Sequence, residues 1–125
     1  MKNYVNEGKT LNYANGTGAD IASGDVVVVG TLLCVAAVDI ANGGSGILHT
    51  GGVYDLPKVD AAVIGQGETL TWDISVGAFD DDQATPAAGD ITGAAAVAVE
   101  SKGATTDGTI RVRLTGVPGD VESGA

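Results

Sequence analysis

Few side chains in this sequence have the chemistry of a catalytic or metal site. His49 is the only histidine and Cys34 the only cysteine. His49 has no cysteine or carboxylate at the spacing of a metal site or a proton relay. Cys34 lies in an apolar run whose neighbours supply nothing to lower the pKa of a thiol. We therefore predict that Cys34 is an inert core residue and that His49 is a partly exposed strand residue.

The triplet Asp80-Asp81-Asp82 is the most concentrated group of carboxylates in the chain. Carboxylate oxygens are hard ligands that suit Ca²⁺. The triplet lacks the alternating ligand spacing and the distal Glu of a dedicated calcium loop. It therefore favours a solvated turn over a cation site, and the sequence does not decide between the two.

No other motif predicts catalysis. The glycine-rich stretch 42–46 lacks the lysine and the following helix of a phosphate-binding loop, so it reads as a hairpin tip. A nucleophile, a base and an orienting group cannot be assembled from one His and one Cys without a relay. We predict that the protein is not an enzyme and that it has no catalytic residues, no cofactor and no metal.

Length and charge limit the class of protein. The chain has 125 residues, the size of one domain, and carries six Lys and Arg against 16 Asp and Glu, a net charge of -10. So acidic a surface repels phosphate backbones and anionic lipid, so we expect neither nucleic acid nor membrane as a partner. No apolar run approaches about 18 residues and the first residues do not resemble a signal peptide, so we expect a soluble protein made in the cytoplasm.

Short, valine-rich apolar runs separated by glycines predict β-strands. The first group contains a lead-in strand at 26–29, a strand at 32–38, a turn at 39–46 and a return strand at 47–53. A second group repeats this pattern, with strands at 94–99 and 109–117. In its return strand Ile110, Val112 and Leu114 should point inward and Arg111 and Arg113 outward. These features predict two related hairpins that pack together.

The remaining segments complete a single all-β domain, a small barrel or sandwich whose strand order stays open. Residues 67–73 alternate, which predicts a strand with Leu70 and Trp72 on its buried face, and 77–79 form a short return strand. Residues 59–64 are the one weak helix candidate. We place an extended N-terminal arm at 1–22, the β-domain at 23–117 and a loose C-terminal tail at 118–125.

Arg111 and Arg113 put two of the six cations on one face of a predicted strand. Such a basic face in an acidic protein could meet an acidic patch on a partner, although two solvated arginines are the simpler interpretation. Aromatic residues are only 4% of the chain and the apolar residues are mostly Ala and Val, so we expect a modestly stable monomer that assembly would stabilise.

Several stretches together resemble one protein family. They are the opening Met1-Lys2-Asn3-Tyr4-Val5 with Gly8, the Ser23-Gly24-Asp25-Val26 entry, the run Gly52 to Lys58, the run Gly67 to Asp73 and the closing Val112-Arg113-Leu114. In this order and spacing, which spans Met1 to about Val117, they resemble the tailed-phage capsid cement, or head decoration, proteins. That family was formerly catalogued only as a domain of unknown function.

The resemblance implies a structural virion protein on the outer surface of an icosahedral head. It implies that the protein bridges subunits of the major capsid protein, often as a homotrimer at local three-fold positions, and that it has no catalytic residues. Residues of the arm would contact the capsid, which makes Lys2, Tyr4, Val5 and Tyr13 candidate interface residues beside Arg111 and Arg113. The oligomeric state, the capsid surface contacted and the role of the tail stay open.

Two other classes of function are compatible with a small β-domain. The main alternative is a carbohydrate-binding β-sandwich, for which a chain with one Trp and three Tyr has few rings to build a sugar platform. The more remote alternative is a metal-dependent enzyme that uses Asp80 to Asp82.

Overall fold

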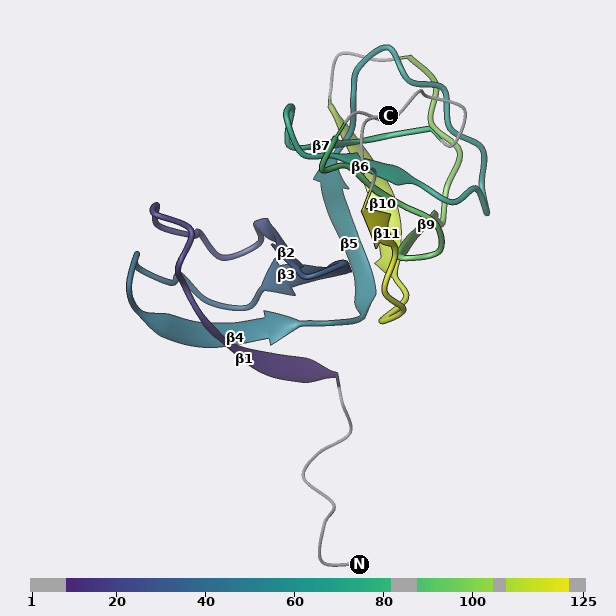
Figure 1. The fold of residues 1–125 in the computed structure, drawn as a ribbon. Helices are drawn as coiled ribbons and strands as arrows, with labels where there is room; N and C mark the ends of the chain where they lie inside the picture. Colours follow the sequence, from purple (N-terminus) through teal and green to yellow (C-terminus); the bar gives the residue numbers. More distant parts are fainter. Residues whose placement is uncertain (1–8, 82–87, 105–107, 122–125) are drawn as a thin grey trace, which may run out of the picture.

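The computed structural model describes residues 9–81, 88–104 and 108–121, and the regular structure in these ranges is entirely β (Figure 1). The eleven strands are β1 (Thr10–Ala14), β2 (Val26–Val29), β3 (Leu32–Ala36), β4 (Ser45–His49), β5 (Gly52–Pro57), β6 (Thr71–Asp73), β7 (Ala78–Asp80), β8 (Ile91–Thr92), β9 (Ala96–Ala98), β10 (Thr109–Leu114) and β11 (Asp120–Val121). They form three antiparallel sheets with the orders β1-β4-β3-β2, β5-β10-β9 and β11-β8-β6-β7. The all-β prediction is confirmed, and none of the sheets closes into a barrel.

Strand β3 lies between two hydrophobic cores. Leu33 and Val35 belong to the larger core, whereas Cys34 and Ala36 belong to the smaller one, which also contains Leu48. Because successive side chains of a strand point to opposite faces, a strand buried on both faces reads as an unbroken apolar run. This explains why residues 32–36 show no alternation of apolar and polar residues.

Both predicted hairpins form, but in different sheets. The first pairs β3 with β4 at Val35 and His49, and the second pairs β9 with β10 at Ala98 and Val112. The predicted return strand at 47–53 is wrong as a single element, because β4 ends before Thr50 and β5 begins at Gly52, which has a φ of 113°. Only glycine adopts that conformation readily, and the break lets the chain leave the first sheet for the second.

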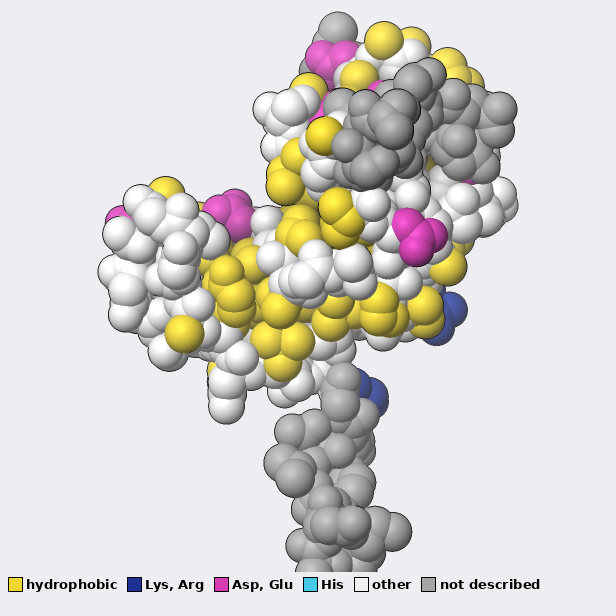
Figure 2. Space-filling view, viewed as in Figure 1, with side chains coloured by type: hydrophobic (Ala, Val, Ile, Leu, Met, Phe, Trp, Pro, Cys, Tyr) yellow, Lys and Arg dark blue, Asp and Glu magenta, His cyan; other side chains and the backbone are white. Residues whose placement is uncertain are grey.

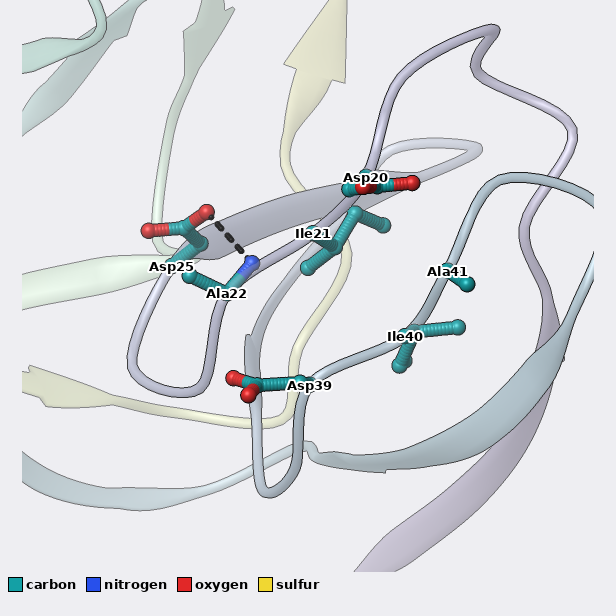
Figure 3. Close-up of a pocket in the computed structure, with 7 residues that line it drawn as sticks. All are labelled: Asp20, Ile21, Ala22, Asp25, Asp39, Ile40 and Ala41. Carbon is teal, nitrogen blue, oxygen red and sulfur yellow. Dashed lines mark hydrogen bonds between the residues drawn. The ribbon is translucent and has the colours of Figure 1, made fainter.

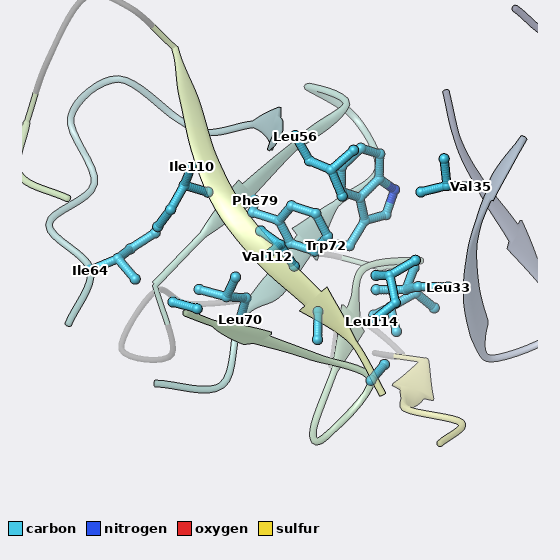
Figure 4. Packing of buried hydrophobic residues seen from close by; sticks show 14 of the residues in the cluster. Leu33, Val35, Leu56, Ile64, Leu70, Trp72, Phe79, Ile110, Val112 and Leu114 are labelled. Carbon is cyan, nitrogen blue, oxygen red and sulfur yellow. The ribbon is translucent and has the colours of Figure 1, made fainter. Parts of the chain in front are cut away.

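The larger core contains the inward side chains of β5, β6, β7 and β10, and β3 packs against it from the first sheet (Figure 4). Trp72 and Phe79 meet edge to face at its centre, with ring centroids 4.8 Å apart. Ile110, Val112 and Leu114 are fully buried on β10, as predicted. Thr71 is buried as well as Trp72, so β6 is covered on both faces and not on one as we predicted.

Residues 59–64 form a turn and not the predicted helix, because their carbonyl oxygens face a buried lysine. The Nζ of Lys58 donates hydrogen bonds to the carbonyl oxygens of Val59, Asp60 and Ala62, at 2.7, 3.2 and 2.8 Å. Lys58 is only 3% exposed. The carbonyl of Val59 also accepts from the N–H of Ala62 at 3.0 Å, which closes a single turn, and the ammonium group gathers the three carbonyls around itself instead of leaving them aligned along a helix axis. No helix in the described ranges is long and apolar enough to cross a membrane.

Part of each predicted terminal segment belongs to a sheet. Residues 10–14 of the predicted arm form β1, an edge strand paired with β4. In the predicted tail, Asp120 and Val121 pair with β8, and the backbone N–H of Gly119 donates to the carbonyl of Thr31 at 2.8 Å. Residues 118–121 are therefore anchored, contrary to the prediction of a loose tail, while 122–125 lie outside the described residues.

Candidate interaction surface

The outward face of the β5–β10 pair carries the two predicted arginines. Strand β10 alternates between exposed and buried residues along its whole length, so Arg111 and Arg113 both point outward as predicted. The antiparallel register places Arg111 opposite Asp55 and Arg113 opposite Val53. The neighbours of the two arginines therefore differ, although the arginines share one strand face.

Arg111 is paired within the chain. Its Nε lies 3.1 Å from Oδ1 of Asp55 and its backbone N–H donates to Oε1 of Glu100 at 3.0 Å. The hydrogen bond to Asp55 and the negative charges of Asp55 and Glu100 raise the pKa of Arg111 above its ordinary value. Both side chains of the ion pair are more than half exposed, so water and salt screen the attraction between them.

Arg113 lies at the rim of a groove of about 630 Å³, and within the described ranges its guanidinium has no hydrogen-bond partner. The opposite residue Val53 is exposed and offers no charge. The groove is lined by Lys9, His49, Thr50, Gly51, Gly52, Arg113, Leu114, Thr115 and Gly116. These lining residues include three basic side chains and no acidic one.

The groove forms where the chain passes from the first sheet to the second. The backbone N–H of Thr50 donates to the carbonyl of Lys9 at 2.9 Å, which fixes the start of β1 beside the end of β4. The Tyr54 hydroxyl donates to the carbonyl of Gly51 at 2.7 Å, and the Tyr54 and His49 rings lie 6.4 Å apart. These contacts hold His49 and Lys9 close to the end of β10 that carries Arg113.

The six predicted interface residues are thus placed differently. Tyr13 is half-buried on β1 and packs against the smaller core. Lys2, Tyr4 and Val5 lie outside the described residues. Arg111 is paired with Asp55, whereas Arg113 has no hydrogen-bond partner among the described residues.

Sequence reasoning missed two residues of the groove. Lys9 was not selected because it stands alone in the sequence between Gly8 and Thr10, and His49 was interpreted as a partly exposed strand residue, which it is. Only the pairing of β1 with β4, where Thr10 faces His49, brings the two together. The one signal in the sequence that could have pointed to Lys9 was the scarcity of cations, because each Lys or Arg strongly affects the local potential of so acidic a chain.

A second hollow, of about 360 Å³, is acidic and lies at the other end of the first sheet (Figure 3). Its carboxylates accept backbone hydrogen bonds: Asp25 from Ala22 at 3.0 Å, Asp39 from Ser23 at 2.8 Å and Asp20 from Asn42 at 2.8 Å. These carboxylates fix the loops around the bridge between Ile21 and Ile40.

The side chains with reactive potential lie apart from one another. Cys34 is fully buried, and burial raises the pKa of its thiol to about 11, as expected of an inert core residue. Asp80 and Asp81 are half-buried, whereas Asp82 lies outside the described residues. No group of His, Cys, Asp and Glu in the described ranges could hold a metal ion. Trp72 is only 6% exposed, so it cannot serve as a sugar platform.

Charged side chains are spread unevenly over the face that Figure 2 shows. The Lys and Arg side chains in view are few and lie towards its lower right, whereas Asp and Glu side chains are scattered over its upper parts. The described residues thus form a small all-β domain that carries a basic groove and a separate acidic hollow.

Comparison with known proteins assigns the family. The sequence model of the phage cement proteins matches residues 5–114, and no curated protein matches the chain. The chain belongs to the phage cement protein family. It is therefore a phage structural protein that associates with the capsid.

Proposed function

We propose that this protein decorates the outside of a phage head, where it binds the major capsid protein and stabilises contacts between neighbouring capsid subunits. The observation that carries this proposal is the family match, which extends over residues 5–114 and so includes most of the β-domain. The protein acts in the virion after its synthesis in the host cytoplasm. It needs no cofactor.

Mass action explains how such a protein stabilises a shell. A ligand that binds only the assembled state lowers the free energy of that state and leaves the dissociated subunits unchanged. The two cores, with Leu33 and Val35 of the first sheet packed against the second, provide a rigid body for this purpose. The N-terminal segment 1–22 and the outward face of β10 supply the contacts, through Lys2, Tyr4, Val5, Tyr13 and Arg113, whereas Arg111 of the same face is already paired with Asp55.

A homotrimer at local three-fold positions is the assembly that we propose on the head. Three copies related by a three-fold axis can each contact a different capsid subunit, which ties the subunits together. The small core, with few aromatic residues, gives a single copy little apolar area to bury. Assembly on the head therefore adds stability that the isolated chain lacks.

Purified protein incubated with phage heads that lack it tests the proposal. We expect saturable binding to expanded heads and an increase in the temperature at which the heads release their DNA. Heads preincubated with bovine serum albumin provide the control. Absence of binding, or binding without a gain in resistance to heat or chelators, would contradict the proposed function.

A further inference from the structure

We propose that the groove around Arg113 binds a carboxylate-bearing segment of the capsid subunit that this protein contacts. The inference rests on the proposed function, because it names the surface and the chemistry of the contact with the head. We call this surface the cationic groove and define it by Lys9, His49, Arg113 and the glycines between them, Gly51, Gly52 and Gly116.

Arg113 is the first argument for an external partner. Arg111 stands two residues away on the same strand face and is already paired with Asp55 at 3.1 Å. Arg113 faces Val53 across the register, and no described residue accepts a hydrogen bond from it. A guanidinium with its five donors free recognises a carboxylate in a two-pronged, planar arrangement.

The shape of the groove is the second argument. Its volume of about 630 Å³ lies within the range of about 300–1,000 Å³ that is typical of ligand sites. Glycines 51, 52 and 116 have no side chains to fill it, so backbone and basic side chains are exposed together. Leu114 and Thr115 complete the wall where β10 ends. The groove has room for an acidic side chain with part of its backbone.

Charge decides the class of partner. The protein carries a net charge of -10, so its overall field repels nucleic acid, and a groove with a few cations does not supply the many phosphate contacts that such binding uses. A second copy of the chain is the alternative occupant, because its acidic hollow carries Asp20, Asp25 and Asp39, and the sedimentation of the free variants distinguishes it from a capsid segment.

Chain continuity connects the groove to the proposed capsid contact. Lys9 lines the groove and is covalently continuous with residues 1–8, which include the proposed contact residues Lys2, Tyr4 and Val5. Lys9 is the first residue that the structure describes, so the described part of the chain begins at the rim of the cationic groove.

The test compares Arg113→Gln with Arg111→Gln, which remove the same charge from the same strand face. Binding of each variant to undecorated heads is measured against wild type at low and high salt, after near-ultraviolet circular dichroism has shown that both variants are folded. We expect Arg113→Gln to weaken binding roughly tenfold, Arg111→Gln to change it by less than about twofold, and Arg113→Lys to restore part of the loss. A Glu-rich decapeptide should compete with the heads, whereas a Lys-rich decapeptide should not.

The outcomes separate the inference from the proposed function. If wild type does not bind heads, the proposed function fails and the inference fails with it. If wild type binds but Arg113→Gln and Arg111→Gln bind equally well, only the inference is overturned. It is also overturned if Arg113→Gln changes the sedimenting mass of the free protein, since the groove then holds a second copy. Competition by a DNA oligonucleotide in place of the Glu-rich peptide would overturn it too.

Discussion

Arg111 and Asp55 face each other across the antiparallel register of β5 and β10, with Nε of the arginine 3.1 Å from Oδ1 of the aspartate. The guanidinium also has a second, longer contact of 3.5 Å with the other carboxylate oxygen. This pair neutralises one of the two arginines that the sequence presents as equivalent. Arg113 is left as the arginine of this strand face that has no hydrogen-bond partner among the described residues.

We expect the Arg111–Asp55 pair to contribute nothing measurable to folding stability. Both side chains are more than half exposed, so water screens the attraction and the ordering of two side chains opposes it. Arg111→Gln should therefore unfold at the same temperature as wild type, in low salt and in 1 M NaCl. A lower thermal midpoint that appears only at low salt would show that the pair does stabilise the fold.

Lys58 should be the most important cation for stability. The ammonium group of this buried lysine donates to three carbonyl oxygens of the turn at 59–64, and hydrogen bonds to charged groups are each worth about 1.5–3 kcal/mol. Lys58→Met fills a similar volume but removes the ammonium donor from all three carbonyls, of which that of Val59 keeps the N–H of Ala62 as a donor. We expect a loss of roughly 2–5 kcal/mol in the free energy of unfolding, measured by urea denaturation.

Arg113→Gln is the matched control for Lys58→Met, because it also removes a single cation but breaks no described hydrogen bond. Its urea midpoint should equal that of wild type. Equal midpoints for Lys58→Met and wild type would mean that water replaces the ammonium group and that the turn at 59–64 does not depend on it.

Cys34 makes stability depend on pH in the alkaline range. Its thiol has a pKa of about 11 in the fold against 9.0 in the unfolded chain, because burial disfavours the thiolate. The folded state therefore holds this proton more tightly, and the resulting stabilisation is complete below pH 9 and is lost as the pH rises towards 11. The full effect is of the order of 2–3 kcal/mol.

The measurement is the difference in unfolding free energy between wild type and Cys34→Ala at pH 8, 9.5 and 11, which cancels the titration of other groups. Wild type should lose stability relative to the variant over this range. The native thiol should also fail to react with a thiol reagent at pH 8 and react once urea unfolds the chain. A constant difference, or rapid labelling of the native protein, would show that Cys34 is accessible.

The elements that could be predicted from the sequence are those set by local pattern. Alternation on β10 placed Ile110 inside and Arg111 outside, and glycine-separated valine runs located most strands. The failures arose where distant residues decide the outcome. Residues 59–64 have a helical composition, but three of their carbonyl oxygens accept hydrogen bonds from the ammonium group of Lys58. Nothing in the local sequence shows that this lysine is buried.

The candidate site was also predictable only where it depends on local sequence pattern. Arg113 was found from its strand pattern, but its difference from Arg111 depends on the register that places Asp55 opposite one and Val53 opposite the other. The cationic groove needs Lys9, His49 and Arg113 to converge from three strands or their ends. The number of charged residues in the sequence does not show which strands pair, so it cannot show that these three residues meet.

Trp72 provides a test of the carbohydrate-binding alternative. Trp72 as a whole residue is 6% exposed and packs against Phe79, so little of it reaches solvent. We expect blue-shifted emission that acrylamide quenches weakly, with no change when sugars are added. Since Trp72 is the only tryptophan, the signal has one source. Sugar-dependent changes in emission, together with selective glycan binding lost in Trp72→Ala, would favour a sugar-binding module.

Gly119 should control whether the C-terminal strand stays attached. A Cβ atom at this position would collide with the carbonyl oxygen of Thr92 and would lie 2.8 Å from Cγ2 of Ile91. Backbone atoms cannot move aside as a flexible side chain can, so Gly119→Ala should detach β11 from β8 or cost about 1–3 kcal/mol through overpacking. Gly103→Ala is the control, because a Cβ there meets nothing within 4 Å and the backbone has no positive φ.

Amide hydrogen exchange over residues 119–121 measures the attachment of β11. In wild type the Gly119 amide donates to Thr31 at 2.8 Å and the strand pairs with Ile91 and Thr92, so these amides should exchange slowly compared with an open chain. Gly119→Ala should raise their exchange rates selectively, and Gly103→Ala should leave them unchanged. Equal protection in both variants would mean that β8 shifts to accept the extra methyl group. In that case the anchoring of the C-terminal strand does not require glycine at 119.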